Sequence, residues 1–209
     1  MQNRSGARRA GAKPARIHIL RASLLALLLL ATLSWGISPR AAAQVDDELA
    51  ERARAAVLTG EDLGPSWTLL VENAGNVVDP VAAHFTSVYG DDRAGPQSSG
   101  VLAAGSAAFI AATPMPSGFA DSFRPGFFAG FGSTSGVGAD AFAEVDGPAV
   151  NGTSARWYVA EVDDPALAFH VVFLENPASI GVVFGAGNQG RISQADVVPL
   201  AQTVADRLR

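Results

Sequence analysis

The sequence predicts an α+β fold, in which a curved and mainly antiparallel sheet of about six or seven strands is packed by N-terminal, middle and C-terminal helices. Segments with the 3.6-residue apolar period of helices lie at both ends of the chain and once in its middle. Segments rich in β-branched and aromatic residues lie between them, separated by turn-forming clusters. The order helix, three strands, helix, four strands, helix lacks the strict strand–helix alternation of a parallel sheet.

The first 43 residues are expected to be a signal peptide (1–43) that precedes the fold. Six basic residues and no acid come first, and the apolar run ASLLALLLLATL follows at 22–33. Three consecutive alanines ending at Ala43 then supply a cleavage site before Gln44. An uncleaved membrane anchor is the alternative, although the whole apolar stretch has 16 residues and a span needs about 20.

The mature chain, 44–209, is expected to be one secreted or otherwise extracytoplasmic domain. Seven of the 15 basic residues lie in the leader, so the mature chain keeps eight basic and all 20 acidic residues, a formal charge of −12. Such a chain should bind neither nucleic acid nor anionic lipid, and should not insert stably into a membrane after processing. It has no cysteine, which excludes disulfides, a thiolate nucleophile and a lipidated cysteine.

The first helix is predicted over 46–58, with Leu49, Ala53, Ala56 and Val57 on one stripe. The stretch LTGEDLGPSWTLL (58–70) then predicts a short capped turn of helix and a first strand. Its helix would begin at Thr59, capped with Asp62, and end at Gly64-Pro65. Trp67, which opens the strand, is expected in the core.

The central part of the chain predicts six further strands around one aromatic helix. Phe119, Phe123 and Phe127 recur every four residues over 117–131, so this segment should be a helix that Pro125 kinks or ends. The Gly/Ser-rich segment 130–138 is expected to be a mobile loop. The strands are expected at 82–90, 99–112, 140–145, 153–162, 167–175 and 179–185.

The last helix should begin at a Ser193 cap and bury one apolar stripe. Four residues at helical spacing form this stripe: Val197, Leu200, Val204 and Leu208. Pro199 is tolerated because it lies near the start of the helix, where its missing N–H matters less.

Three segments resemble a known family: ARAAVLTGEDLGPSWTL near the start of the mature chain, the Gly-rich middle, and VVFGAGNQGRISQADVVPLAQTVADRLR at the end. They are similar to exported bacterial proteins such as the PknH-like extracellular sensor domains and lipoproteins of mycobacteria. The resemblance implies a sensor or ligand-binding module on a curved antiparallel sheet with a cleft. This chain departs from it in having no cysteine, and the resemblance assigns no site residue.

Two motifs that could indicate a cofactor or metal are weak. GAGNQG at 185–190 fits the dinucleotide pattern G-x-G-x-x-G, but no second strand or acid about 20 positions on follows to hold a ribose, so a Gly-rich turn is expected. His84 and His170 have no H-x-H or H-x-x-x-H spacing, which leaves a metal site with Asp163 or Glu175 as the weaker alternative. We expect no cofactor and no metal.

The sequence also lacks the G-x-S-x-G elbow of serine hydrolases, so it indicates no catalytic serine. The strongest remaining feature is the Phe-rich segment, which either fills the core or lines a pocket for a small apolar ligand. The candidate ligand residues are Phe119, Phe123 and Phe127, with Arg124 or Arg156 as the polar contact. We therefore expect a non-catalytic binding or sensor-like protein of the bacterial envelope, whose partner is such a ligand or an envelope component. A secreted hydrolase and a structural or adhesive envelope module are the alternatives.

Overall fold

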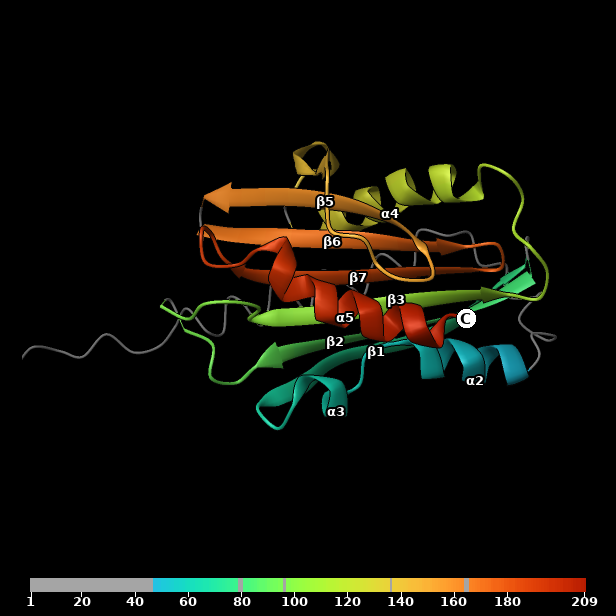
Figure 1. Ribbon diagram of the computed structural model, residues 1–209, viewed down its shortest axis with the longest axis horizontal. Helices are drawn as coiled ribbons and strands as arrows, with labels where there is room; N and C mark the ends of the chain where they lie inside the picture. Colours follow the sequence, from blue (N-terminus) through green and yellow to red (C-terminus); the bar gives the residue numbers. More distant parts are fainter. Residues whose placement is uncertain (1–46, 79–80, 96, 136, 164–165) are drawn as a thin grey trace, which may run out of the picture.

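The computed structural model describes residues 47–209 except 79–80, 96, 136 and 164–165. The expected signal peptide lies outside these residues. The described chain forms one seven-stranded sheet in the order β1-β2-β3-β7-β6-β5-β4, and every neighbouring pair is antiparallel. Three longer helices flank the sheet (Figure 1). The predicted α+β fold is confirmed, with helices near the start, in the middle and at the end of the described chain.

The elements follow the predicted order, with a short second helix after the first and a 3₁₀ turn before the fourth strand. Their bounds are α2 (Asp47–Ala56), α3 (Gly60–Leu63), β1 (Trp67–Val78), β2 (Val81–Asp91), β3 (Ala103–Ala111), α4 (Phe119–Ser135), η2 (Ala139–Ala141), β4 (Ala143–Val145), β5 (Ser154–Asp163), β6 (Ala166–Asn176), β7 (Ser179–Asn188) and α5 (Gln194–Arg207).

The predicted starts of α3 and α5 are confirmed by their capping residues. The Thr59 amide donates to the Asp62 carboxylate at 2.7 Å, and the Ser193 amide donates to the Asp196 carboxylate at 2.8 Å. Each acid thereby satisfies a backbone donor that the first helical turn leaves without a partner. Gly64 ends α3 with φ +98°, a left-handed conformation that glycine adopts at no steric cost.

Helices α2 and α5 lie on one face of the sheet, and α5 crosses the face turned to the viewer in Figure 1. This face packs closely through small residues. A Cβ built on Gly181 would lie 2.6 Å from Leu208, and one on Gly185 would lie 2.7 Å from Val197. The glycines of β7 therefore make room for α5. The fully buried residues of the two helices are Ala53, Ala56, Val197, Ala201, Val204 and Ala205.

These glycines correct the expected role of GAGNQG. Strand β7 runs to Asn188, so Gly185 and Gly187 are strand residues and not part of a turn. Only Gly190 has the positive φ, +70°, of a left-handed turn. The prediction of a Gly-rich turn was thus wrong for the first half of the motif, because close packing of a helix on a strand selects glycine as strongly as a turn does.

The opposite face of the sheet carries α4, which packs through phenylalanine rings. Phe123, Phe128 and Phe131 are buried, while Phe119 and Phe127 are partly buried at the edge of the same cluster. The ring of Phe173 in β6 lies 5.5 Å from that of Phe128. The buried stripe therefore passes through Phe128 and not Phe127. Residues spaced four apart drift around the helix, since an α-helix has 3.6 residues per turn.

Helix α4 continues through Pro125 and ends at Ser135, so the predicted loop over 130–138 was wrong for its first six residues. Phe128 and Phe131 follow the proline and pack on Phe142, at ring distances of 4.5 and 5.1 Å. Tertiary burial of these rings outweighs the roughly 1 kcal/mol by which each glycine weakens a helix.

Two further expectations are corrected. Trp67 is only half-buried at the start of the edge strand β1, opposite Asp91, and it belongs to neither core cluster. The buried tryptophan is Trp157 of β5, whose indole N–H donates to the Pro148 carbonyl at 2.9 Å. In α5, Leu200 is half-buried, and Ala201 takes the central place in the stripe. Val197, Val204 and Leu208, the last of which directly follows α5, are buried as predicted.

Candidate functional site

Strand register places a row of side chains on the α4 face near one end of the sheet. Ser154 of β5 pairs with Glu175 of β6, and Glu175 pairs with Ile180 of β7. The row continues through Phe109 of β3 to His84 of β2. Directly opposite residues in an antiparallel sheet point to the same face. Three consecutive strands thus present a hydroxyl, a carboxylate and an aliphatic side chain side by side.

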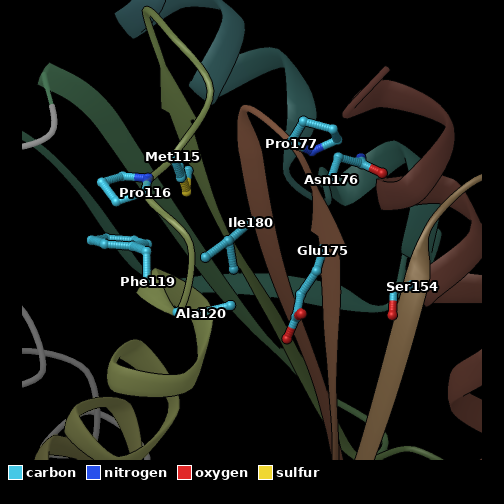
Figure 2. A pocket seen from close by; sticks show the side chains of 10 residues that line it. Met115, Pro116, Phe119, Ala120, Ser154, Glu175, Asn176, Pro177 and Ile180 are labelled. Atoms are coloured by element: carbon cyan, nitrogen blue, oxygen red, sulfur yellow. The ribbon is translucent and has the colours of Figure 1, made fainter.

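The first helical turn of α4 lies over this row and forms one wall of an open pocket of about 280 Å³. Figure 2 shows Met115, Pro116 and Phe119 on one side of the pocket and Asn176 and Pro177 on the other. Its remaining lining residues are Gly118, Ala120, Ser154, Glu175 and Ile180. Seven of the ten lining residues are apolar, and Ser154, Glu175 and Asn176 are polar. Small-molecule sites likewise combine apolar side chains with a few polar groups.

Backbone hydrogen bonds fix the two sides of the pocket to each other. The Met115 amide donates to the Pro177 carbonyl at 2.7 Å, which ties the β3–α4 connection to the β6–β7 turn. Gly118 has φ +78°, so the chain reverses there and enters α4 with Phe119 over the pocket. A residue with a Cβ would be strained in this conformation.

A buried arginine lies behind the pocket wall. Arg124 is 7% exposed, and its guanidinium donates to the carboxylates of Glu175 and Asp121. Burial opposes its charge, but the neighbouring carboxylates outweigh burial and raise the pKa of Arg124 above its ordinary value. Glu175 lines the pocket and Arg124 does not. The guanidinium of Arg124 is instead bound to two carboxylates of its own chain.

The five predicted ligand residues do not form one site. Phe119 lines the pocket and Arg124 touches it only through Glu175. Phe123 is 2% exposed within the core, and Phe127 lies farther along α4. Arg156 is 44% exposed and paired with Glu144 at 3.4 Å, outside the pocket lining.

Sequence reasoning missed most of the lining because it comes from three separate segments, 115–120, 154 and 175–180. The one local signal was Glu175, an acid at the end of the apolar strand LAFHVVFLE. A charge there is unusual enough to mark a partner or a ligand contact. Its partner Arg124 lies 51 positions away, so only the folded chain identifies the pair.

The two histidines lie on opposite faces of the sheet and cannot share a metal ion. His84 shares the α4 face with Glu175 and stacks on Phe109 at a ring distance of 5.4 Å. His170 pairs across the sheet with Gly185, on the face that carries α5. Within the described ranges, no group of three or more His, Asp or Glu side chains is placed to hold a metal.

His84 is buried without polar partners. It is 6% exposed, and among the described residues neither of its ring nitrogens has a hydrogen-bond partner. Burial lowers the pKa of His84 because the charged imidazolium would lose its hydration. The folded protein therefore favours neutral His84.

This histidine should make the folded state less stable in acid. An unfolded His84 binds a proton below about pH 6.5, whereas the folded residue resists it, so stability is full above that pH and falls as the pH drops through the lowered pKa. We expect wild type to lose up to about 1.4 kcal/mol per pH unit more than His84→Leu. Urea unfolding at pH 8 and pH 5 measures this, and equal losses in the two proteins would contradict it.

Comparisons with models of protein families, with curated protein sequences and with solved structures gave no match. The resemblance to PknH-like sensor domains therefore stays a prediction. No helix in the described part of the chain combines the length and apolar character that a membrane span requires.

Proposed function

We propose that this chain is an exported, non-catalytic binding or sensor-like protein that takes a small, largely apolar ligand in the pocket between α4 and the β6–β7 turn. The observation that carries the proposal is the pocket itself, where Phe119, Met115 and Ile180 share the lining with a single carboxylate, that of Glu175. An apolar lining with one charged group suits recognition of a ligand by shape and one polar contact.

The composition of the pocket supports binding over hydrolysis. Ser154 is the only hydroxyl among the lining residues, and no histidine lines the pocket. A serine nucleophile needs a base within hydrogen-bond reach, and the acid opposite Ser154, Glu175, is already bound to Arg124. A secreted hydrolase would thus need a site elsewhere in the chain.

Ligand binding is tested with Phe119→Ala and, as a matched control from the same helix, Phe127→Ala. Both phenylalanines are partly buried, but only Phe119 lines the pocket. In titrations with 1-hexanol, we expect Phe119→Ala to weaken binding about fivefold, since it removes roughly 1 kcal/mol of apolar contact. Phe127→Ala should bind as wild type does.

The readout is the chemical shift of backbone amides at Gly118 and Ala120 in the purified protein. Equal weakening in the two variants, or no shift change at the pocket in wild type, would refute binding at this place. Shift changes confined to residues outside the pocket would refute it too.

Export is the second part of the proposal, and its support is the charge and apolar pattern of the first 43 residues. The protein recovered outside the cytoplasm should begin at Gln44. Intact-mass measurement checks this, because a retained residue 1 would leave a mass near the 21.5 kDa of the whole chain. That result would favour the uncleaved anchor.

A further inference from the structure

The charge on the pocket wall determines which kind of ligand head group the site can accept. Among the described residues, no basic side chain lines the pocket, and Glu175 is the one acid that does. Arg124 stands behind Glu175 and also binds Asp121, so the three groups together carry one net negative charge. A ligand anion in the pocket would lie beside this excess negative charge, and a cation would be attracted to it.

One oxygen of the Glu175 carboxylate is still available to a ligand. Oε1 accepts from Arg124, whereas Oε2 has no hydrogen-bond partner among the described residues. The other polar groups are less suitable. The side-chain oxygen of Asn176 accepts from the Ser179 hydroxyl, and its NH2 group donates to the carbonyls of Gly152 and Glu175. Glu175 Oε2 is therefore the strongest acceptor that the pocket offers, and it requires a donor on the ligand.

The rest of the lining suits the same kind of ligand. Phe119 presents an aromatic ring, which can attract a cation, and Met115 presents a thioether chain, which packs on an alkyl chain. Residues 44–209, with eight basic and 20 acidic residues, have a formal charge of −12, which would raise the local concentration of cations.

We propose that the pocket selects an apolar ligand with a protonated amine head, which donates to Glu175 Oε2 while its apolar body packs on Phe119, Met115 and Ile180. This inference rests on the proposed binding function. It assigns the polar contact to an acid, whereas the sequence predicted that Arg124 or Arg156 would supply it.

The test compares three probes of equal chain length at pH 7: hexylammonium, 1-hexanol and hexanoate. We expect hexylammonium to bind about tenfold more tightly than 1-hexanol, as a charge-assisted hydrogen bond allows, and hexanoate to bind most weakly. Glu175→Gln should reduce the preference for hexylammonium over 1-hexanol to about twofold or less. Asp121→Asn is the matched control, because Asp121 also binds Arg124 but its side chain is 71% exposed and lies outside the pocket. It removes the same amount of negative charge but leaves Glu175 Oε2 in place, so it should reduce the preference less than Glu175→Gln does.

Because Glu175→Gln removes a partner from a buried arginine, a second variant leaves that pair intact. Ser154→Lys places an ammonium on an exposed residue directly across from Glu175, where it competes for Oε2. Within this variant, hexylammonium and 1-hexanol should bind with similar affinity, so the ratio of their two dissociation constants is the readout.

Two outcomes separate this inference from the proposed function. If 1-hexanol or hexanoate binds as tightly as hexylammonium in wild type, the amine preference is refuted while binding at the pocket stands. If none of the three probes binds, both proposals fail. A preference for hexylammonium that survives in Ser154→Lys would place the amine away from Glu175 and overturn the inference.

Discussion

Deletion of residues 191–209 is expected to abolish the cooperative unfolding transition. The deleted segment contains α5 and the residue that follows it, and its Val197, Val204 and Leu208 are buried against the sheet. Burial of each such side chain contributes about 1.5–3 kcal/mol, so their sum approaches the whole stability of a typical domain, about 5–15 kcal/mol. Deletion would also expose the face of β7 that Gly181 and Gly185 leave without side chains. Thermal unfolding followed by circular dichroism measures the effect.

The C-terminal helix also holds the start of the fold in place. Arg207 donates to the Val57 carbonyl at 2.8 Å and pairs with Asp62 at 2.6 Å. Deletion of Arg209 alone is the control, since its bonds to Asn151 and Asp206 are exposed and worth less than about 1 kcal/mol. A cooperative melt in the longer deletion would show that α5 is dispensable and would contradict the packing described for this face.

Phe123→Ala is expected to destabilise the protein by about 3–5 kcal/mol, because it removes a buried ring and leaves a cavity. The Phe123 ring contacts Phe109 of β3 at 4.6 Å and Phe173 of β6 at 6.2 Å, so the loss affects both halves of the sheet. Urea unfolding gives the change in free energy. A change of less than about 2 kcal/mol would contradict a core role.

Phe119→Ala is the matched comparison for this variant, one helical turn earlier. Phe119 is partly buried and lines the pocket, so its loss should affect stability less and ligand binding more. Phe123→Ala should leave 1-hexanol binding per folded molecule unchanged. If Phe123→Ala weakened binding while sparing stability, the pocket would extend deeper under α4 than the lining residues indicate.

The helices were predictable from sequence because their determinants are local. Thr59 with Asp62 and Ser193 with Asp196 are capping pairs three residues apart, and the stripe of Leu49, Ala53 and Ala56 repeats at helical spacing. Strand existence was equally local, since β-branched and aromatic runs mark strands wherever they pair. Trp67 was misplaced because a bulky residue suits a half-buried edge strand as well as a core one.

Helix α4 shows where local signals gave the wrong answer. Pro125 and the following glycines predicted an early end, yet the helix reaches Ser135. Packing of Phe128 and Phe131 on Phe142 stabilises the later turns, and no local rule contains that contact.

The sequence by itself determined the order and type of the elements, the helix caps and the acidic character of the chain, because each depends on residues close together or on composition alone. Only the tertiary structure decided the candidate site. Strand register brings Ser154, Glu175 and Ile180 into one row, and α4 sets Phe119 over it. The polarity of that site also depends on tertiary structure, since the guanidinium of Arg124 is bound by an acid 51 residues away. A charge pattern along the chain cannot reveal which of two paired charges faces a ligand, because that depends on which one the fold buries.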